Sequence, residues 1–474
     1  MTESHSAPTA VSRLLAETLT GQISRREMMK RAAAMGLSAG LIGTMLQVTG
    51  QSLSAQDKPA GWSLKAPKDL SQDFKGQTIS VILGADGPVV PWEEAAVKLF
   101  SDTTGVTVKR TSGPESTTDR LALYQQFLGA GASDTDAMMI DVIWPGILAQ
   151  HAFDLTAAMK ANGAEYFERI VKNNTVDGVL VGIPWFTDAG LLYFRTDLIE
   201  KAGGTAPQTW AEMEKLAQQI TESERSANPD FQGFVFQGAA YEGLTCDALE
   251  WQYSNGGGTI VDEDAKVTVN NPAAIAAFDR AKAWVGGIAP KGVTTYKEED
   301  SRGVWQAGNA AFMRNWPYCY SLGQAADSKI KDKFDVSAVP MGEGDGATHA
   351  DCLGGWQLMV SKYSKSTGPA AEFARFLTSP EVQTSFAIEQ SRLPTIAALY
   401  DDTDVLAANP FFSKLKPVFQ GGAVARPSSA TKDLYNDVST AYFTAINQIL
   451  TGQGATADLI GKLEQDLQKV VSEL

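Results

Sequence analysis

The chain has 474 residues, of which 44% are hydrophobic and 20% charged, a composition typical of a globular protein with two or three domains. Acidic residues outnumber basic ones by 55 to 40, so the formal net charge is −15. This acidity argues against a nucleic-acid or anionic-membrane partner, because both require a basic protein surface. With three cysteines and three histidines, most metal and redox chemistry is disfavoured as well.

The first 55 residues are organised like an export signal. A polar segment containing arginines is followed by an uncharged Ala-, Gly-, Leu- and Met-rich stretch over 32–48, and small residues come next. This order predicts a signal peptide over 1–55, cleaved near Ser54 or Ala55. The apolar stretch is short of the ~20 residues that a transmembrane anchor, the alternative, would need. The adjacent Arg25 and Arg26 resemble the twin-arginine export motif, so we expect a periplasmic or cell-surface protein.

The cysteine count is odd, with Cys246, Cys319 and Cys352 as the only members. Twin-arginine export moves proteins that have already folded in the reducing cytoplasm, where disulfides are rare. We therefore expect buried free thiols rather than a disulfide framework.

After a polar lead-in over 56–75, the chain alternates between strand and helix patterns. The first part predicts, in order, a strand at 78–83, a helix at 91–103, a strand at 106–110, a helix at 117–128 and a strand at 137–142. Such an order implies a parallel sheet with right-handed crossovers. Between 184 and 195 the periodicity is weak.

The pattern then resumes and continues to the end of the chain. We expect a helix at 210–223, a strand at 231–237, an edge hairpin at 256–264, a helix at 272–285, a mobile loop at 341–349, a strand at 356–360, helices at 369–377 and 380–388, and two long helices within 432–474. The last two are separated at Gly452–Gly454.

Sequence motifs of catalysis are mostly missing. Beyond the predicted signal segment, the chain has no glycine motif of the dinucleotide-binding, phosphate-binding or nucleophile-elbow type. His5 falls in the signal segment, and His151 with His349 can hardly build a zinc site or a catalytic triad. We therefore expect no enzyme activity, no catalytic residue, no metal and no cofactor. Paired carboxylates of a glycosidase stay open as an alternative, because no spacing singles out a pair.

Aromatic and charged residues instead gather at loop positions that follow strands. They occur at 141–146, 184–188, 241–244, 314–318, 354–356 and 426–427. In open α/β sheets, ligands bind beyond the carboxyl ends of the strands. A tryptophan beside carboxylates and guanidinium groups suits a neutral sugar, whose C–H face packs on a ring while its hydroxyls accept and donate hydrogen bonds. The alternative is that the tryptophans are core residues and the charges are solvated.

These stretches resemble the extracellular solute-binding proteins (family 1) of sugar-uptake ABC transporters, near the trehalose/maltose-binding group. The resemblance covers about 76–474 and is most specific at 118–125, 141–146, 182–193, 241–244, 311–318, 354–356 and 376–383. No single stretch would suffice, but together they identify the family.

The resemblance implies an α/β chain with the two-lobed periplasmic-binding-protein fold (type II). Each lobe is expected to be a mainly parallel sheet flanked by helices, and hinge segments cross between lobes near 184–190, 352–357 and 400–410. The implied domains are lobe 1 over 76–186 and 357–403, and lobe 2 over 187–356 and 404–474. A sugar would lie in the cleft between them.

The resemblance also implies a set of ligand-binding residues, carried over position by position. They are Arg120, Asp141, Phe186, Asp188, Tyr241, Glu242, Trp316, Gly354, Trp356 and Arg426. Phe186 stands where relatives commonly have a tyrosine. A carboxylate that relatives place after the first strand has only Asp86 and Glu93 as candidates.

Roles for five of these residues can be stated. Trp316 and Trp356 are expected to stack on sugar rings from opposite sides of the cleft mouth. Asp141 lies just past an apolar strand and is expected to accept hydrogen bonds from sugar hydroxyls, while Arg120 and Arg426 donate them. The alternative for the polar residues is a structural Asp–Arg salt bridge.

The sequence thus predicts a monomeric binding protein that captures an α-linked disaccharide similar to trehalose, maltose or sucrose and presents it to the permease subunits of an ABC transporter. One alternative is a binding protein for another glycoside, such as a glucosyl polyol or an oligosaccharide. The other is an exported carbohydrate-active enzyme.

Overall fold

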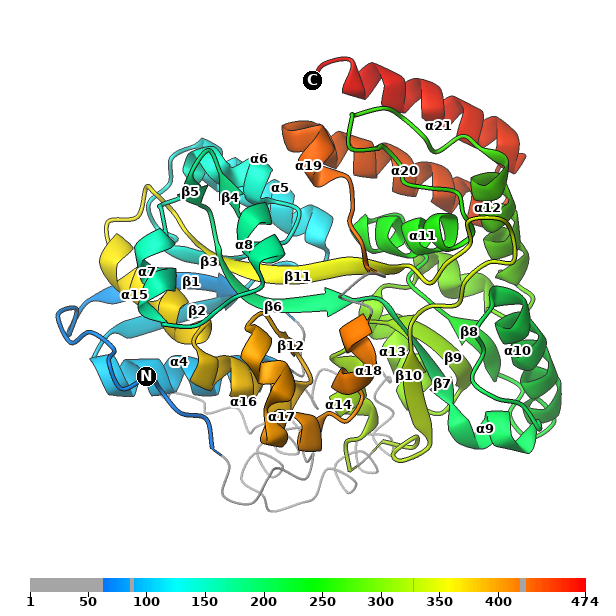
Figure 1. The fold of residues 1–474 in the computed structure, drawn as a ribbon, viewed down its shortest axis with the longest axis horizontal. Coiled ribbons are helices and arrows are strands. Elements are labelled where there is room, and N and C mark those ends of the chain that lie inside the picture. Colours follow the sequence, from blue (N-terminus) through cyan, green and yellow to red (C-terminus); the bar gives the residue numbers. More distant parts are fainter. Residues whose placement is uncertain (1–62, 86–88, 327, 418–422) are drawn as a thin grey trace, which may run out of the picture. The chain divides into compact units, whose positions relative to one another are not determined.

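The computed structural model describes residues 63–85, 89–326, 328–417 and 423–474 (Figure 1). The predicted signal peptide, with Arg25 and Arg26, lies outside these residues, as does Asp86. Within the described ranges, every helix falls short of the length and apolarity that a membrane span requires.

The first sheet is built from strands at both ends of the chain. Its order is β12-β6-β11-β3-β1-β2, with β13 paired to β11. The strands are β1 (Thr78–Leu83), β2 (Thr107–Ser112), β3 (Ala137–Asp141), β6 (Ile183–Ala189), β11 (Asp351–Val360), β12 (Leu393–Pro394) and β13 (Ala423–Val424). The parallel β1–β2 and β1–β3 pairs follow the predicted β-α-β order.

A second, smaller sheet has the order β10-β7-β9-β8. It comprises β7 (Leu191–Arg195), β8 (Gln232–Val235), β9 (Ala310–Asn315) and β10 (Phe334–Ser337). A separate two-stranded sheet pairs β4 (Thr175–Val176) with β5 (Val179–Leu180).

The expectation of mainly parallel sheets is wrong in one respect: both sheets are mixed. In the first sheet, β11 runs antiparallel to β3 and to β6, and β12 runs antiparallel to β6. In the second sheet only β8 and β9 are parallel. The reason is topological, since β6 leaves the first sheet for the second and β11 comes back, so the two connecting strands point in opposite directions.

The weak pattern between 184 and 195 is two consecutive strands, β6 and β7, separated by Gly190. All residues of both strands are buried. A strand covered on both faces loses the alternation of apolar and polar residues by which a sequence is recognised as a strand. The Gly190 amide donates to the carbonyl of Cys352 on β11 at 3.1 Å, so the two connecting strands lie side by side (Figure 1).

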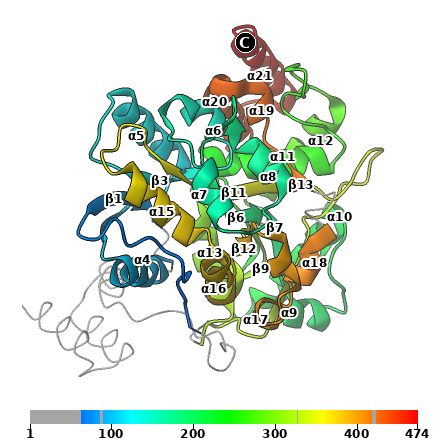
Figure 2. The same ribbon diagram turned by 60° about the vertical axis from the view of Figure 1, so that its left-hand side comes forward.

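The helices confirm most of the predicted elements. They are α4 (Val90–Thr104), α5 (Thr117–Gly129), α6 (Pro145–Leu148), α7 (Thr156–Ala161), α8 (Glu168–Asn173), α9 (Thr196–Lys201), α10 (Trp210–Glu224), α11 (Glu242–Ser254), α12 (Pro272–Trp284), α13 (Glu298–Gln306), α14 (Cys319–Gly323), α15 (Thr367–Leu377), α16 (Pro380–Gln390), α17 (Thr403–Ala408), α18 (Phe412–Pro417), α19 (Ser428–Thr431), α20 (Tyr435–Leu450) and α21 (Thr456–Val471). Both views show α20 and α21 packed along each other (Figures 1 and 2).

Local chemistry explains where several helices begin. Thr209 and Glu212 form a capping box that starts α10, and Asn271 caps α12 while Pro272 occupies its first turn. The predicted edge hairpin at 256–264 is reduced to a single bridge between Val261 and Val267.

Two predictions about irregular and buried parts can also be compared. The 341–349 segment has neither helix nor strand beyond one bridge at Met341. The three cysteines are buried and form no disulfide, as expected.

Candidate functional site

Register across three strands of the first sheet sets predicted site residues side by side. Trp356 on β11 pairs with Asp141 on β3 and with Phe186 on β6. Two residues earlier on β11, Gly354 pairs with Asp188. Residues that are distant in the sequence are thus gathered by strand pairing alone.

Asp141 and Arg426 form a buried ion pair. Asp141 ends a strand that is entirely buried, so its carboxylate emerges at the carboxyl end of the sheet but stays 5% exposed. Arg426 Nη2 donates to Asp141 Oδ1 at 3.0 Å, and the Ile143 amide donates to the same oxygen at 3.2 Å. This contact is the salt bridge considered as the alternative to sugar binding.

Glu242 completes a three-residue charge network with the same guanidinium. Arg426 Nη1 donates to Glu242 Oε1 at 2.8 Å, and Tyr435 OH and Ser439 Oγ donate to the two carboxylate oxygens at 2.5 and 2.6 Å. Glu242 is the first residue of α11, where the helix dipole favours a negative charge. Burial raises the pKa of Glu242, although Arg426 and the two hydroxyl donors oppose that rise.

Arg426 keeps one donor unused within this network. Its Nε has no hydrogen-bond partner among the described residues, and the side chain is almost fully buried. Burial disfavours the guanidinium charge, but Asp141 and Glu242 outweigh that effect and the pKa of Arg426 is raised. Since an unsatisfied buried donor is costly, an acceptor that reached Nε would stabilise this network.

Arg120 lies over the ring of Trp356. The guanidinium carbon is 4.9 Å from the ring centroid, and Nε and Nη2 both donate to the Pro114 carbonyl at 2.9 and 2.7 Å. Arg120 is 2% exposed, and within the described ranges no ion pair joins it to a carboxylate. Its charge is therefore stabilised by a carbonyl and a π face. Trp144 packs edge-on against Trp356 at 5.7 Å.

Trp316, the residue that follows β9 of the second sheet, has a similar arrangement. The Arg314 guanidinium carbon lies 4.1 Å from the Trp316 ring centroid. A Cβ atom on Gly354 would be 3.0 Å from Trp316 Cζ3 and 3.2 Å from Asp188 Cβ, so a glycine at 354 lets both side chains approach β11. Trp316 and Trp356 are both half-buried.

Phe186 and Asp188 share one arginine that the sequence did not single out. Arg392 lies 4.8 Å from the Phe186 ring centroid, and its Nη1 is 3.9 Å from Asp188 Oδ2. Phe186 also packs edge-on against Phe386 at 5.4 Å. The phenylalanine therefore sits in an aromatic and cationic environment.

Tyr241 precedes α11 and is buried, with Lys297 Nζ 5.6 Å from its ring centroid. Burial raises the pKa of Tyr241 well above its ordinary value. Beside it, the Glu242 amide donates to Thr118 Oγ1 at 3.4 Å, which brings the beginnings of α5 and α11 together.

Of the two carboxylate candidates near the first strand, Glu93 already has partners. Its Oε2 accepts from Arg110 Nε at 2.8 Å, and the Gly84 amide donates to Oε1 at 3.2 Å. Asp86 lies outside the described residues.

Arg314 stands in the predicted 314–318 cluster but was not among the predicted ligand-binding residues, and Arg392 was missed altogether. Arg314 carried a signal, since it stands two residues before Trp316 and residues i and i+2 share one side of an extended chain. Nothing in the sequence marks Arg392. Tyr435 and Ser439, the hydroxyl donors to Glu242, lie one helical turn apart on α20, on the buried face that also carries Val438 and Tyr442. An amphipathic pattern marks such positions as core residues and gives no sign of a polar partner.

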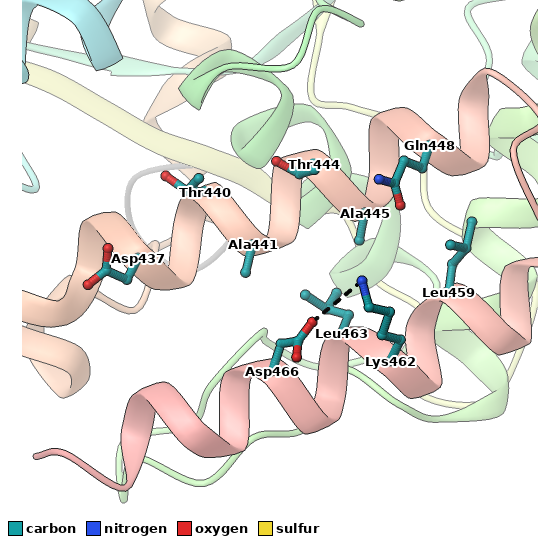
Figure 3. A pocket seen from close by; sticks show the side chains of 10 residues that line it. All are labelled: Asp437, Thr440, Ala441, Thr444, Ala445, Gln448, Leu459, Lys462, Leu463 and Asp466. Carbon is teal, nitrogen blue, oxygen red and sulfur yellow. Dashed lines mark ion pairs between the residues drawn. The ribbon is translucent and has the colours of Figure 1, made fainter.

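A surface groove of about 290 Å³ lies between α20 and α21, lined by mixed polar and apolar side chains (Figure 3). Lys462 and Asp466 form an ion pair across one turn of α21 beside it, at 4.0 Å. None of the predicted ligand-binding residues lines this groove. The described residues also contain no cluster of three or more side chains able to hold a metal ion.

Comparison with known proteins finds relatives that match most of the chain. A probable ABC transporter-binding protein of Deinococcus radiodurans is 51% identical over 369 residues, covering 77% of this chain and 87% of the relative. The structure of maltose-bound MalE3 of T. maritima is 38% identical, with a TM-score of 0.78 over 83% of this chain and 99% of that one. The maltotriose-bound binding protein of Thermus thermophilus shares the fold, with 18% identity and a TM-score of 0.69 over 83% of this chain and 100% of that one.

These neighbours confirm the two-lobed periplasmic-binding-protein fold. The profile of the family described as bacterial extracellular solute-binding protein matches residues 86–384. On the strength of that match and of the 51% identity, the chain belongs to the bacterial extracellular solute-binding proteins.

Proposed function

We propose that this chain captures an α-linked disaccharide similar to trehalose, maltose or sucrose and delivers it to the permease of an ABC transporter. The observation that carries the proposal is a pair of half-buried tryptophans, Trp316 and Trp356, each with a guanidinium stacked on its ring. Trp356 pairs with Asp141 across β11 and β3, and Asp141 belongs to the Asp141–Arg426–Glu242 network, in which Arg426 Nε has no hydrogen-bond partner among the described residues. Aromatic faces and charge-assisted hydrogen bonds together suit a neutral, hydroxyl-rich ligand.

The relatives support the same class of ligand. The protein of known structure that shares 38% identity is described as maltose-bound. Other proteins with this fold are described with tagatose, ribitol or acarbose, at identities at which only the fold is comparable. The disaccharide is therefore the part of the proposal that most needs a direct measurement.

We place the protein outside the cytoplasmic membrane, as a monomer that docks on permease subunits. Family membership supports export, and the basic–apolar–small order of residues 1–55 supports a cleaved, twin-arginine-type signal.

Lobe 1 is assigned to 76–186 with 357–403, and lobe 2 to 187–356 with 404–474. The change of sheet at Gly190, close to the proposed boundary at 186/187, supports a crossing in this segment, although β6 stays in the first sheet as far as Ala189. Small-angle scattering of the free and sugar-bound protein tests this, because closure of two lobes reduces the radius of gyration.

A thermal-shift screen of the exported protein tests the function. Trehalose, maltose, sucrose, maltotriose, mannitol and glycerol 3-phosphate are compared, because a ligand at 100 times its Kd adds about 2.7 kcal/mol of stability. Stabilisation by at least one α-linked disaccharide, with a 1:1 calorimetric titration, is the expected result. A response limited to maltotriose would overturn the disaccharide in favour of an oligosaccharide. A response limited to mannitol or glycerol 3-phosphate would overturn it in favour of a free polyol or a polyol phosphate. Release of monosaccharides during incubation would favour an enzyme instead.

A further inference from the structure

Arg314 is held by a dense set of buried acceptors. It lies on β9 and is 0% exposed. Its Nε and Nη2 donate to the two carboxylate oxygens of Glu250 at 2.8 and 2.5 Å, in the two-pronged geometry that a guanidinium forms with a carboxylate. Nη1 donates to Gln237 Oε1 at 3.0 Å, and Asp247 Oδ1 lies 3.0 Å from Nε. The plane of the guanidinium is thereby fixed.

The Arg314–Glu250 pair abuts both connecting strands. The Cys352 amide on β11 donates to Glu250 Oε1 at 3.0 Å. At the junction of β6 and β7, a Cβ atom on Gly190 would lie 1.8 Å from Glu250 Oε1 and 2.2 Å from Arg314 Nη2. The ion pair therefore rests directly on the backbone by which the chain passes between its two sheets.

The face of the same guanidinium covers Trp316. The guanidinium carbon is 4.1 Å from the ring centroid, while the benzo edge of the ring reaches Gly354 on β11. The guanidinium of Arg314 thus contacts the Trp316 ring, on which a sugar is predicted to stack, with its flat face. The edge of the same group lies against the connecting strands. Lysine cannot do both, because an ammonium group has neither a planar fork nor a flat face.

We propose that Arg314 is a positioning residue for ligand binding, which fixes the Trp316 ring relative to the connecting strands at Gly190 and Cys352. This inference rests on the proposed function in one respect, namely that Trp316 contacts the sugar. A buried arginine that served only the stability of the second sheet would lower the Tm when replaced, but would leave the Trp316 ring ordered and the sugar affinity of the folded protein unchanged. The two roles therefore predict different responses to Arg314→Lys.

The first experiment needs no ligand. The protein is labelled with 5-fluorotryptophan, and the Trp316 signal in the fluorine NMR spectrum is assigned from its loss in Trp316→Phe. In Arg314→Lys, this signal is expected to shift and broaden. Arg375→Lys is the matched control. Arg375, on α15, is also buried and also donates to a carboxylate, that of Glu372, through two nitrogens at 3.0 and 2.8 Å. An unchanged Trp316 signal in folded Arg314→Lys would overturn the proposal.

The second experiment measures affinity by calorimetry with maltose and trehalose as probes. Arg314→Lys is expected to weaken binding roughly three- to thirty-fold, the range of a desolvated cation–π contact. In a Trp316→Ala background the same change should have little further effect on Kd, while its effect on Tm persists. If Arg314→Lys weakens sugar binding by the same factor with and without Trp316, the two residues are not coupled and the proposal is wrong. If neither maltose nor trehalose binds the wild-type protein, the proposal of an α-linked disaccharide ligand is wrong. The fluorine spectra still test whether Arg314 positions Trp316.

Should Arg314→Lys fail to fold, Glu250→Gln perturbs the same pair with the guanidinium retained. The Trp316 signal is then expected to shift in Glu250→Gln and to stay in place in Glu372→Gln, the matching change beside Arg375. A Trp316 signal that stays in place in both variants would overturn the proposal.

Discussion

Arg426 Nη2 lies 3.0 Å from Asp141 Oδ1, although the two residues are 285 positions apart in the chain, and both side chains are buried. The pair therefore contributes to the free energy of unfolding of the sugar-free protein, whether or not it also contacts a ligand. Glu242 holds the other Nη of the same guanidinium, so removing one carboxylate leaves the cation with a single anionic partner.

The first prediction is that Asp141→Asn lowers the stability of the sugar-free protein by roughly 1.5–3 kcal/mol, the usual contribution of a hydrogen bond to a charged group. Asparagine keeps the shape but removes the charge that faces Arg426. Urea unfolding of the free protein measures the change. An unaltered midpoint together with weaker sugar binding would show that Asp141 acts on the ligand and not on the fold.

The second prediction concerns the aromatic platforms. Trp316→Ala and Trp356→Ala are each expected to reduce sugar affinity by roughly 2–4 kcal/mol, or about 30- to 1000-fold. Trp284→Ala is the matched control, because Trp284 packs in the core against Trp251 at 5.5 Å and is 3% exposed. That variant should lose stability and keep its affinity. If the folded Trp316→Ala and Trp356→Ala variants bind sugar with normal affinity, the two tryptophans are structural residues and not ligand-binding ones.

How much of the fold the sequence predicts depends on whether an element has one exposed face. The strand at Thr78–Leu83 and the helices α12, α20 and α21 were predicted closely, since their periodicity and end signals are local. The strands β6 and β7 were not, because burial of both faces removes the alternation. The start of β11 at Asp351 was missed because Gly354 and Gly355 interrupt the pattern.

In the candidate site, too, features set by the local sequence were predictable and features set by tertiary contacts were not. Its residue types were predictable in part, because Trp316 stands two residues after Arg314 and Trp356 follows the glycine pair Gly354–Gly355 in short motifs. The partners were not, since the Arg426–Asp141 pair is set by tertiary folding and no local pattern reports it.

The third prediction is that Gly190→Ala is severely destabilising, by at least about 3 kcal/mol. The added Cβ would lie 1.8 Å from Glu250 Oε1, and displacing that carboxylate breaks a buried ion pair with Arg314. Gly461→Ala is the control, because nothing lies within 4 Å of a Cβ there and alanine favours the α21 helix. The Tm of both variants is measured by thermal melting. A Tm of Gly190→Ala close to the wild-type value would contradict the close approach of Glu250 and Arg314 to the Gly190 backbone.

The fourth prediction concerns export and falls on residues outside the described structure. Changing Arg25 and Arg26 together to lysine should leave the precursor in the cytoplasm, because the twin-arginine pathway requires the guanidinium pair and not the charge alone. Arg13→Lys is the control. Cell fractionation with an antibody to the mature protein gives the readout, and normal export of the double variant would leave only a general secretory signal.

The fifth prediction follows from a carboxylate that is buried without full compensation. Asp351, the first residue of β11, is 0% exposed; its Oδ1 accepts from the Val339 amide at 2.8 Å, while Oδ2 has no hydrogen-bond partner among the described residues. Burial raises the pKa of Asp351 well above its ordinary value, and nearby Glu250 adds to the rise that Val339 and Arg314 oppose.

A carboxyl whose pKa is higher in the folded than in the unfolded state stabilises the protein below its unfolded pKa, and that contribution is lost as pH rises through the folded pKa. Asp351→Asn stays neutral at every pH and keeps an acceptor for Val339. The variant should therefore match or fall below the wild type in stability near pH 4 and gain on it steadily toward pH 8. Urea midpoints across that range measure the difference, and exposed Asp264→Asn controls for the loss of one unit of charge. A difference between Asp351→Asn and wild type that stays constant with pH would mean that the carboxyl is ionised at no cost in the folded protein.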